Sequence, residues 1–385
     1  MAIDPQKLLT SSLKRCPYGE SITGILAAAL DAVDPAEAVT RYLRRDGDRL
    51  LADRQAYNLE GIRNIYLVGA GKAGSPMAGA AVGVLGDCLT GGLVIVKDGY
   101  AGVDDGHVGH GIEIVQAAHP LPDARGVEAS RRIMETVGNA GPDDLLICLI
   151  SGGGSALLTA PANEIALADM QELTTQLLRR GAAIDEINAL RKHLDAVKGG
   201  GLARLAPQTR KIVLVLSDVI GDRLDVIASG PFCADPSTFQ DAWRVLERFD
   251  MLESAPPAVL EMLRGGLRGD IPDTPKPGDP LFNLVQHVLV GSNLQAARAA
   301  QEAAKKAGFQ PILLTTSLKG EARQAGLFFV ELAHQVDSHA YPAARPACLI
   351  AGGETTVTLT GRGLGGRNQE IALAAVPGMA GLPDA

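Results

Sequence analysis

The sequence has little of what would place it outside the ordinary globular proteins. Aromatic residues make up only 4% of the 385 positions, and there is a single tryptophan. No apolar run approaches the roughly 18 residues that a membrane-spanning helix needs. The first residues do not combine a charged segment with an apolar core, which is the pattern of a secretory signal peptide. We therefore expect a cytoplasmic protein that does not enter a membrane.

Cysteine and clustered positive charge are also scarce. The five cysteines are odd in number and far apart, and no pair has metal-ligand spacing, which is typical of reduced thiols. The net charge is −8 and the lysines and arginines are scattered, which disfavours nucleic-acid binding. Anionic ligands must therefore be bound by local groups. The sequence does not settle the oligomeric state, and a homo-oligomer is compatible with it.

The 385 residues suffice for about two or three domains. In the first part of the chain, apolar runs alternate with helical patterns, which is typical of a parallel sheet covered on both faces. We predict an α/β fold with a Rossmann-like N-terminal domain at 1–240, a helical connection and linker at 241–284, and a smaller α/β C-terminal domain at 285–385. The expected strands are 65–68, 92–96, 112–115, 145–150 and 211–216, then 285–290, 311–314 and 347–351.

In such a sheet ligands bind beyond the carboxyl ends of the strands, so we expect the functional residues in the loops that follow the strands. The loop Gly69–Gly74 matches the G-x-G-x-x-G dinucleotide pattern and lies between a strand and a helix, which favours a nicotinamide-dependent reductase. A dinucleotide site also needs an acidic residue after the second strand. Asp98 lies there, but Lys97 directly before it makes this criterion ambiguous. Lys72 within the loop instead suits neutralisation of a phosphoryl group. Both interpretations stay open.

Two further strand ends carry polar groups. Ser151 to Ser155 enclose three glycines, whose free amides and flanking hydroxyls suit an oxyanion, although a flexible turn has the same composition. Asp218 and Asp222 follow the strand at 211–216, and Mg²⁺ takes one or two carboxylates together with nucleotide phosphates. Either aspartate could instead cap a helix or pair with Arg223.

Two more residues are candidate substrate contacts. Lys198 begins a run of glycines after a helix that contains Arg191 and Lys192, and these two are more often part of a solvated face. His119 lies in a proline-rich loop, where a lone histidine is more often structural.

The C-terminal part contains a second glycine-rich loop. An apolar strand is followed by Glu354, a short alternating strand, the glycines between 361 and 366, and the arginines 362 and 367. Glycines allow close backbone approach, and a helix predicted at 371–376 would direct its positive end toward the loop. Phosphate is the natural ligand, although a hairpin with solvated arginines is the simpler alternative.

Seven motifs together resemble the class II glycerate kinases, also called glycerate 2-kinases of the MOFRL family, in order and spacing over nearly the whole chain. They are Val68–Gly74, His119–Asp123, Ile150–Ser155, Asn188–His193 with Lys198, Ser217 and Asp218 with Asp222, Ala228–Pro231, and Gly352–Glu370. The resemblance implies ATP-dependent, Mg²⁺-assisted phosphorylation of D-glycerate at its 2-hydroxyl. Members are also labelled hydroxypyruvate reductases. They usually continue into a Gly/Asp-rich segment beyond this helix, so we expect an incomplete C-terminal domain.

The implied site residues have the following roles. Lys72 and Arg367 would stabilise the transferring phosphoryl group and the glycerate carboxylate, in either assignment. Glu354 would orient the acceptor hydroxyl or a metal-bound water. The other assignments are phosphate contacts from Gly71, Ser151, Gly152, Gly153, Gly154, Ser155, Gly365 and Gly366, substrate contacts from His119, Lys198 and Asn368, and Mg²⁺ ligands Asp218 and Asp222. A protein that binds a small organic acid without turnover would explain the glycines and arginines but not the paired aspartates.

Overall fold

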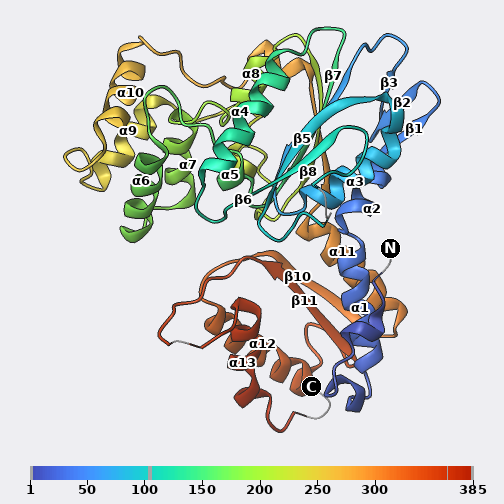
Figure 1. The fold of residues 1–385 in the computed structure, drawn as a ribbon. Coiled ribbons are helices and arrows are strands. Elements are labelled where there is room, and N and C mark those ends of the chain that lie inside the picture. The colour runs from blue at the N-terminus through green and yellow to red at the C-terminus, as the bar shows by residue number, and fades with distance from the viewer. Residues whose placement is uncertain (1–2, 103–105, 362, 383–385) are drawn as a thin grey trace. The chain divides into compact units, whose positions relative to one another are not determined.

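The computed structural model describes residues 3–102, 106–361 and 363–382 and divides the chain into two compact units. The larger unit is Ala38–Val290, and the smaller unit combines Met1–Glu37 with Gly291–Ala385. Each unit has its own sheet and helices (Figure 1). Within the described ranges, no helix has the length and apolar character needed to cross a membrane.

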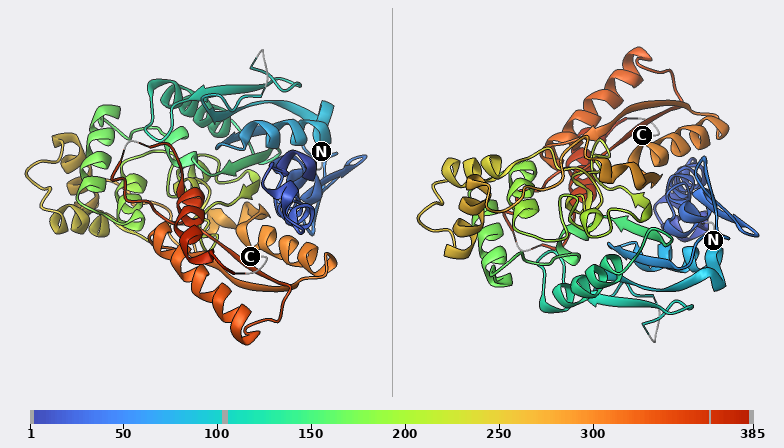
Figure 2. Two further views of the ribbon diagram at one scale, coloured as in Figure 1. Left: turned by 90° about the horizontal axis from the view of Figure 1, so that it is seen from below. Right: turned by 90° about the horizontal axis from the view of Figure 1, so that it is seen from above.

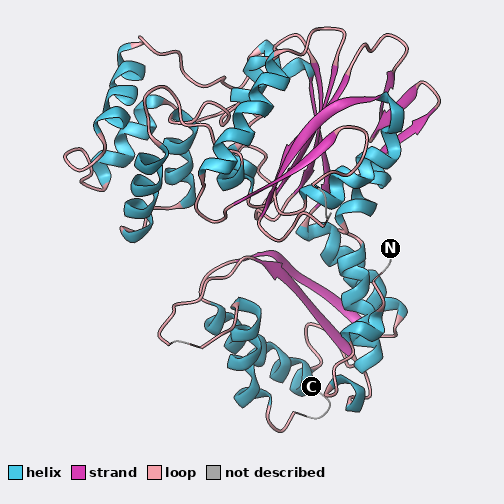
Figure 3. Cartoon of the chain, viewed as in Figure 1, coloured by secondary structure: helices cyan, strands magenta, loops and turns pink. Residues whose placement is uncertain are grey.

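A six-stranded sheet forms the centre of the larger unit (Figure 3). Its spatial order is β6-β5-β4-β7-β8-β9, and the pairs that join β6 through β8 are all parallel. This order is that of a doubly wound Rossmann sheet, so the predicted Rossmann-like α/β architecture is confirmed. The strands are β4 (Ile65–Ala70), β5 (Leu89–Lys97), β6 (Ile112–Ala117), β7 (Leu145–Ser151), β8 (Arg210–Leu216) and β9 (Val285–Gly291).

Strand β7 shows why these runs are continuously apolar. Its odd-numbered residues from Leu145 to Leu149 belong to one buried cluster, and its even-numbered residues from Leu146 to Ile150 belong to another. Successive side chains of a strand point to opposite faces, so both faces of the sheet are covered. Helix α3 (Gly74–Leu85) packs on the first face, while α4 (Ala124–Gly138) and α8 (Gly201–Leu205) pack on the second.

A small antiparallel sheet, which sequence analysis does not predict, completes the first face. It consists of β1 (Leu43–Asp46), β2 (Arg49–Ala52) and β3 (Gln55–Asn58), and it follows α2 (Pro35–Tyr42). Leu43 and Leu50 are completely buried in the same cluster as α3. With four residues each, these strands are too short to produce a clear alternating pattern.

Four helices gather at one end of the larger unit (Figures 1 and 2). They are α6 (Leu167–Arg179), α7 (Ile184–His193), α9 (Phe239–Arg248) and α10 (Pro257–Arg268), and they share one apolar core. Sequence analysis treats 241–284 as a connection and linker, but most of this stretch is packed structure. Thr238 caps α9 through the amide of Asp241, and Phe239 and Val259 are buried in the shared core.

The position of β9 also differs from the prediction. Sequence analysis places 285–290 at the start of the C-terminal domain, whereas β9 is the sixth strand of the large sheet, beside β8. Val288 and Val290 are buried in the core of that sheet. A short apolar run identifies a strand but not the sheet that it joins. The expected boundaries at 240 and 285 therefore do not coincide with those of the compact units.

The smaller unit contains a two-stranded parallel sheet of β10 (Gln310–Leu318) and β11 (Ala347–Gly353). Its helices are α1 (Gly19–Asp31), α11 (Asn293–Lys306), α12 (Ala322–His339) and α13 (Arg367–Met379). Sequence analysis assigns the first helix to the N-terminal domain, but Ile25 of α1 packs against Ala300 and Ala304 of α11. The short strand expected after Gly353 is reduced to an isolated bridge between Glu321 and Thr356.

Candidate functional site

The register of the large sheet brings the predicted residues of the larger unit to one edge. Ala70, the last residue of β4, lies opposite both Ile95 and Ile150, so the turn that contains Lys72 begins beside the last residues of β5 and β7. Lys72 N donates to Gly152 O. The remaining pairs bring His119 and Asp218 to the same carboxyl edge. The strand order reverses between β4 and β7, and ligands of doubly wound sheets bind at such a point.

The loop after β7 is the centre of this group. Gly153 has φ of +85°, and a Cβ there would lie 3.2 Å from both the His119 ring and Cε of Lys72. A Cβ at Gly152 would lie 1.9 Å from Oδ2 of Asp218. Glycine is favoured at Gly153 by its positive φ, and at Gly152 a larger residue would require the Asp218 carboxylate to move. The predicted grouping of Lys72, His119 and Asp218 is present in the fold.

Backbone amides distinguish this loop from the G-x-G-x-x-G turn. In that turn, Gly71 N donates to Ile95 O, and Lys72 N donates to Gly152 O at 2.9 Å. Ala73 N donates to Oγ of Ser151 at 3.1 Å. Among the turn and loop hydrogen bonds of the described residues, by contrast, none is donated by the amides of Gly152 or Gly153. The turn therefore uses its donors internally, whereas the loop after β7 has two donors available for an anion.

Positive charge gathers at the same edge. The ammonium groups of Lys72 and Lys97 form no ion pair with any residue that the structure describes. Burial lowers the pKa of His119, and both lysines lower it further, while Asp218 opposes them. His119 is therefore neutral near pH 7. The edge combines two lysine charges, a neutral imidazole and two amides, which together suit an anionic ligand.

A hydrogen-bonded chain supports the far side of the loop. The hydroxyl of Ser155 lies 3.0 Å from that of Ser229, which donates to Oδ1 of Asn188 at 3.1 Å. Ala228 and Ser229 both have positive φ, of 52° and 58°, which is uncommon for residues other than glycine. Sequence analysis did not list Asn188 or Ser229 as site residues, although both lie in the motifs that carry the family resemblance.

The two predicted metal ligands differ in environment. Asp218 is exposed, whereas Asp222 is half-buried, and its Oδ1 is buried without a hydrogen-bond partner among the described residues. Arg223 binds Asp185 and Asp225. The described residues contain no cluster of three or more His, Cys, Asp or Glu that could hold a metal ion. Mg²⁺ takes most of its ligands from nucleotide and water, so it needs only one or two carboxylates from the protein. Asp218 and Asp222 could supply these, and Oδ1 of Asp222 has no other partner in the described chain.

Lys198 does not fit its predicted role as a substrate contact. It is 2% exposed, and its Nζ donates to Leu158 O at 2.7 Å, to Oγ1 of Thr159 at 3.1 Å and to Oδ2 of Asp195 at 2.6 Å. An ammonium has three N–H donors, and all three are used. Lys198 therefore holds the chain after α7 against the segment that follows α5 (Gly154–Leu157). A run of charged and glycine residues cannot reveal such a distant carbonyl partner.

The other predicted residues lie in the smaller unit. Arg367 is the first residue of α13, and its guanidinium is hydrogen-bonded to the carboxylate of Glu354 and to Thr355 O. Gly365, Gly366 and Asn368 are exposed beside it. Arg362 lies outside the described residues. The predicted helix is present, but it begins at Arg367, four residues before the expected start. Arg367 and Glu354 neutralise each other.

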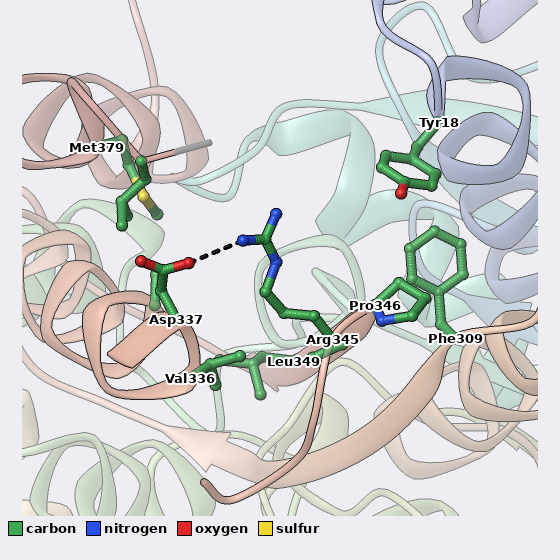
Figure 4. Close-up of a pocket in the computed structure, with 11 residues that line it drawn as sticks. Tyr18, Phe309, Val336, Asp337, Arg345, Pro346, Leu349 and Met379 are labelled. Atoms are coloured by element: carbon green, nitrogen blue, oxygen red, sulfur yellow. Dashed lines mark hydrogen bonds and ion pairs between the residues drawn. The ribbon is translucent and has the colours of Figure 1, made fainter. Parts of the chain in front are cut away.

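A cavity of about 430 Å³ lies elsewhere in the smaller unit and is lined by none of the predicted residues (Figure 4). Its walls are mainly apolar, with Tyr18 and Phe309 on one side and Met379 on another. Its charged groups, Asp337 and Arg345, bind each other at 2.8 Å. The ammonium groups and loop amides at the edge of the large sheet do not line this cavity.

Comparison with known proteins gives consistent matches. A model described as a domain of unknown function (DUF4147) matches residues 21–264, and the model of the MOFRL family matches residues 347–385. A glycerate 2-kinase of Pyrococcus horikoshii is 38% identical over 352 residues, which cover 91% of this chain and 77% of that protein.

Two further matches bear on the alternatives. A protein of Agrobacterium vitis with the provisional name of a hydroxypyruvate reductase is 41% identical over 323 residues, which cover 82% of this chain and 70% of that protein. The crystal structure of glycerate kinase from Thermotoga maritima matches with a TM-score of 0.78 and 36% identity, covering 98% of this chain and 81% of that one.

Proposed function

The chain belongs to the glycerate kinase family, and from this membership and the edge of the large sheet we infer that it phosphorylates D-glycerate. The γ-phosphoryl group of ATP is transferred to the 2-hydroxyl, which gives 2-phospho-D-glycerate and ADP. A new P–O bond forms to the acceptor oxygen as the bond to the β-phosphate oxygen breaks. The family resemblance read from the motifs is confirmed.

One observation supports this inference most strongly. Two available amides and the Lys72 ammonium lie at the switch point of the sheet, and the Lys97 ammonium lies one strand away. Neither lysine has an ion-pair partner among the described residues, in a chain whose net charge is −8. Phosphoryl transfer depends mainly on positioning and on stabilising negative charge, and these groups provide both. Lys72 is proposed to stabilise the transferring group, Gly152 and Gly153 to bind phosphate oxygens, and the neutral His119 to orient the acid.

Asp218 and Asp222 would hold Mg²⁺. When bound, the ion neutralises nucleotide phosphates and helps to align them. For the smaller unit, the family motif predicts ligand contacts from Arg367, Asn368, Gly365, Gly366 and Glu354. Glu354 also pairs with Arg367. Its carboxylate neutralises Arg367, so an anion that binds Arg367 has to compete with it.

The reductase alternative finds less support. Dinucleotide binding by a G-x-G-x-x-G turn needs the turn's amides for the pyrophosphate, and those of Gly71, Lys72 and Ala73 are already hydrogen-bonded within the chain. The other alternative, a binding protein without turnover, would need neither the paired aspartates nor a free lysine at the switch point.

The test is a coupled assay with D-glycerate, ATP and Mg²⁺ that resolves 2-phosphoglycerate from 3-phosphoglycerate, beside a reaction with hydroxypyruvate and NAD(P)H. We expect 2-phosphoglycerate and no oxidation of NAD(P)H. Oxidation without phosphorylation would overturn the kinase assignment. Saturable binding of ATP and D-glycerate without product would instead support the binding protein.

A further inference from the structure

Lys97 lies at the carboxyl edge of the large sheet, one strand away from the β4–β7 switch point. It is the last residue of β5, it is half-buried, and its Nζ lies 5.2 Å from the centre of the Tyr100 ring. An ammonium near an aromatic face remains able to bind an anion. No carboxylate among the described residues forms an ion pair with it.

Two carboxylates of the neighbouring loops, those of Asp98 and Asp123, are bound by Arg125. Arg125 binds Asp98, the neighbour of Lys97, through two hydrogen bonds of 2.8 Å. The same guanidinium binds Asp123 at 2.7 Å, at the end of the His119 loop. A bidentate pair of this kind has a fixed geometry, so Asp98 is held by Arg125 rather than by Lys97. Arg125 also links the loop after β5 to the loop after β6.

The order of groups along the edge suggests what Lys97 binds. Parallel strands are spaced by roughly 5 Å, so β4 separates Lys97 from the amides of Gly152 and Gly153. Lys72 lies between them. The loop after β6 starts beyond Lys97, but it brings the His119 ring back to Gly153. Phosphates at the amides would place the reacting phosphorus near Lys72. In a 2-hydroxy acid, the carboxylate is bonded to the carbon that bears the reacting hydroxyl, so it must lie within a few bond lengths of the transfer.

We propose that Lys97 binds the carboxylate of the acceptor and selects a 2-hydroxy acid over a neutral alcohol, an inference that rests on the proposed kinase function. Lys97 is then a specificity-determining residue, and Lys72 is left for the phosphoryl group. Arg125 is a positioning residue, because it prevents Asp98 and Asp123 from competing with the substrate for Lys97.

The first test compares the wild-type protein with Lys97→Met and Lys97→Arg, using D-glycerate and its neutral methyl ester as acceptors. We expect Lys97→Met to raise KM for D-glycerate by roughly 10- to 100-fold, the cost of losing a charged hydrogen bond, with little change in KM for ATP. The preference of the Lys97→Met variant for D-glycerate over the methyl ester should fall by a similar factor. Lys97→Arg should retain most of that preference, and Lys306→Met, at an exposed lysine of α11, should behave as wild type.

The outcomes separate two failures. If the wild-type protein does not phosphorylate D-glycerate, the proposed function fails. If it does, but Lys97→Met raises KM for ATP instead or keeps its preference for the acid, the carboxylate assignment is wrong. Arg125→Met gives an independent measurement should Lys97→Met not fold. We expect Arg125→Met to raise KM for D-glycerate and to leave KM for ATP unchanged. If the variant has the same KM as the wild type for each of the two acceptors, the proposal is contradicted.

Discussion

Nζ of Lys192 lies 3.1 Å from Oδ1 of Asp235, and the two side chains are 4% and 0% exposed. The same ammonium lies 3.4 Å from Asp225. Asp235 also accepts hydrogen bonds from Ser237 and Thr274. This buried pair joins α7 to the chain that enters α9. Sequence analysis assigns Lys192 to a solvated face, and the structure corrects that assignment.

Removing one partner of this pair should be costly. We expect Lys192→Met to lower the free energy of unfolding by about 3–5 kcal/mol, because an uncompensated carboxylate stays buried. Urea denaturation measures this, and a double-mutant cycle with Asp235→Asn gives the coupling. The control is Arg268→Met, which removes an exposed pair with Asp270 and should cost less than about 1 kcal/mol. Equal losses in the two variants would show that the pair contributes little.

Gly152→Ala should disrupt the loop after β7, because the new Cβ would collide with the Asp218 carboxylate at 1.9 Å. We expect a loss of kinase activity and a lower melting temperature. Gly79→Ala in α3 is the matched control, since nothing lies within 4 Å of its Cβ position. That change should stabilise the protein by roughly 0.5–1 kcal/mol. Full activity in Gly152→Ala would mean that the loop relaxes without cost.

Lys72→Ala should reduce kcat by on the order of 100-fold, because the ammonium is proposed to stabilise charge that develops during transfer. KM for D-glycerate should change much less than in Lys97→Met, which separates the roles of the two lysines. Steady-state kinetics with both substrates varied measures this. Wild-type turnover in Lys72→Ala would remove Lys72 from the mechanism.

Chelation of divalent ions should abolish activity, and Asp222→Asn should raise the Mg²⁺ concentration for half-maximal rate by at least about tenfold. The reason is that Oδ1 of Asp222 is buried without a partner in the described chain and is available to a cation. Asp250→Asn is the control, because Asp250 has a similar positive φ of 50° but is exposed in another part of the unit. If both variants keep the wild-type Mg²⁺ dependence, Asp222 is not a ligand.

His287 should make stability depend on pH. Burial lowers its pKa from 6.5 to about 4, and its Nε2 lies 3.1 Å from Sγ of Cys233. Between pH 6.5 and 4 the unfolded chain binds a proton at His287 that the folded chain does not bind. The free energy of unfolding therefore decreases as the pH falls from 6.5 to 4, and the effect of His287 is constant below pH 4. The loss is about 3 kcal/mol. His287→Gln should be less sensitive over this range in urea denaturation, and parallel curves for the two proteins would contradict the prediction.

Much of the larger unit could be predicted because its strands are continuous apolar runs followed by distinctive loops. The runs at 65–68 and 145–150 correspond to β4 and β7, and the loops after them contain Lys72 and Gly152. The sheet joined by β9 and the partner of α1 could not be predicted. An apolar segment shows that it is buried, but its partner is selected by packing against residues far away in the chain.

The sequence by itself determined the strands, the glycine-rich turns and the order of motifs that resembles the glycerate kinases, because these depend on neighbouring residues. Only the tertiary structure decided which cations are available to a ligand. Lys192 and Lys198 are neutralised by buried aspartates, whereas Lys72 and Lys97 have no ion-pair partner among the described residues. Asp235 is separated from Lys192 by 43 positions, and the hydrogen-bond partners of Lys198 include Leu158, 40 positions away. The charge that a lysine offers to a ligand depends on such distances, which exist only once the chain has folded.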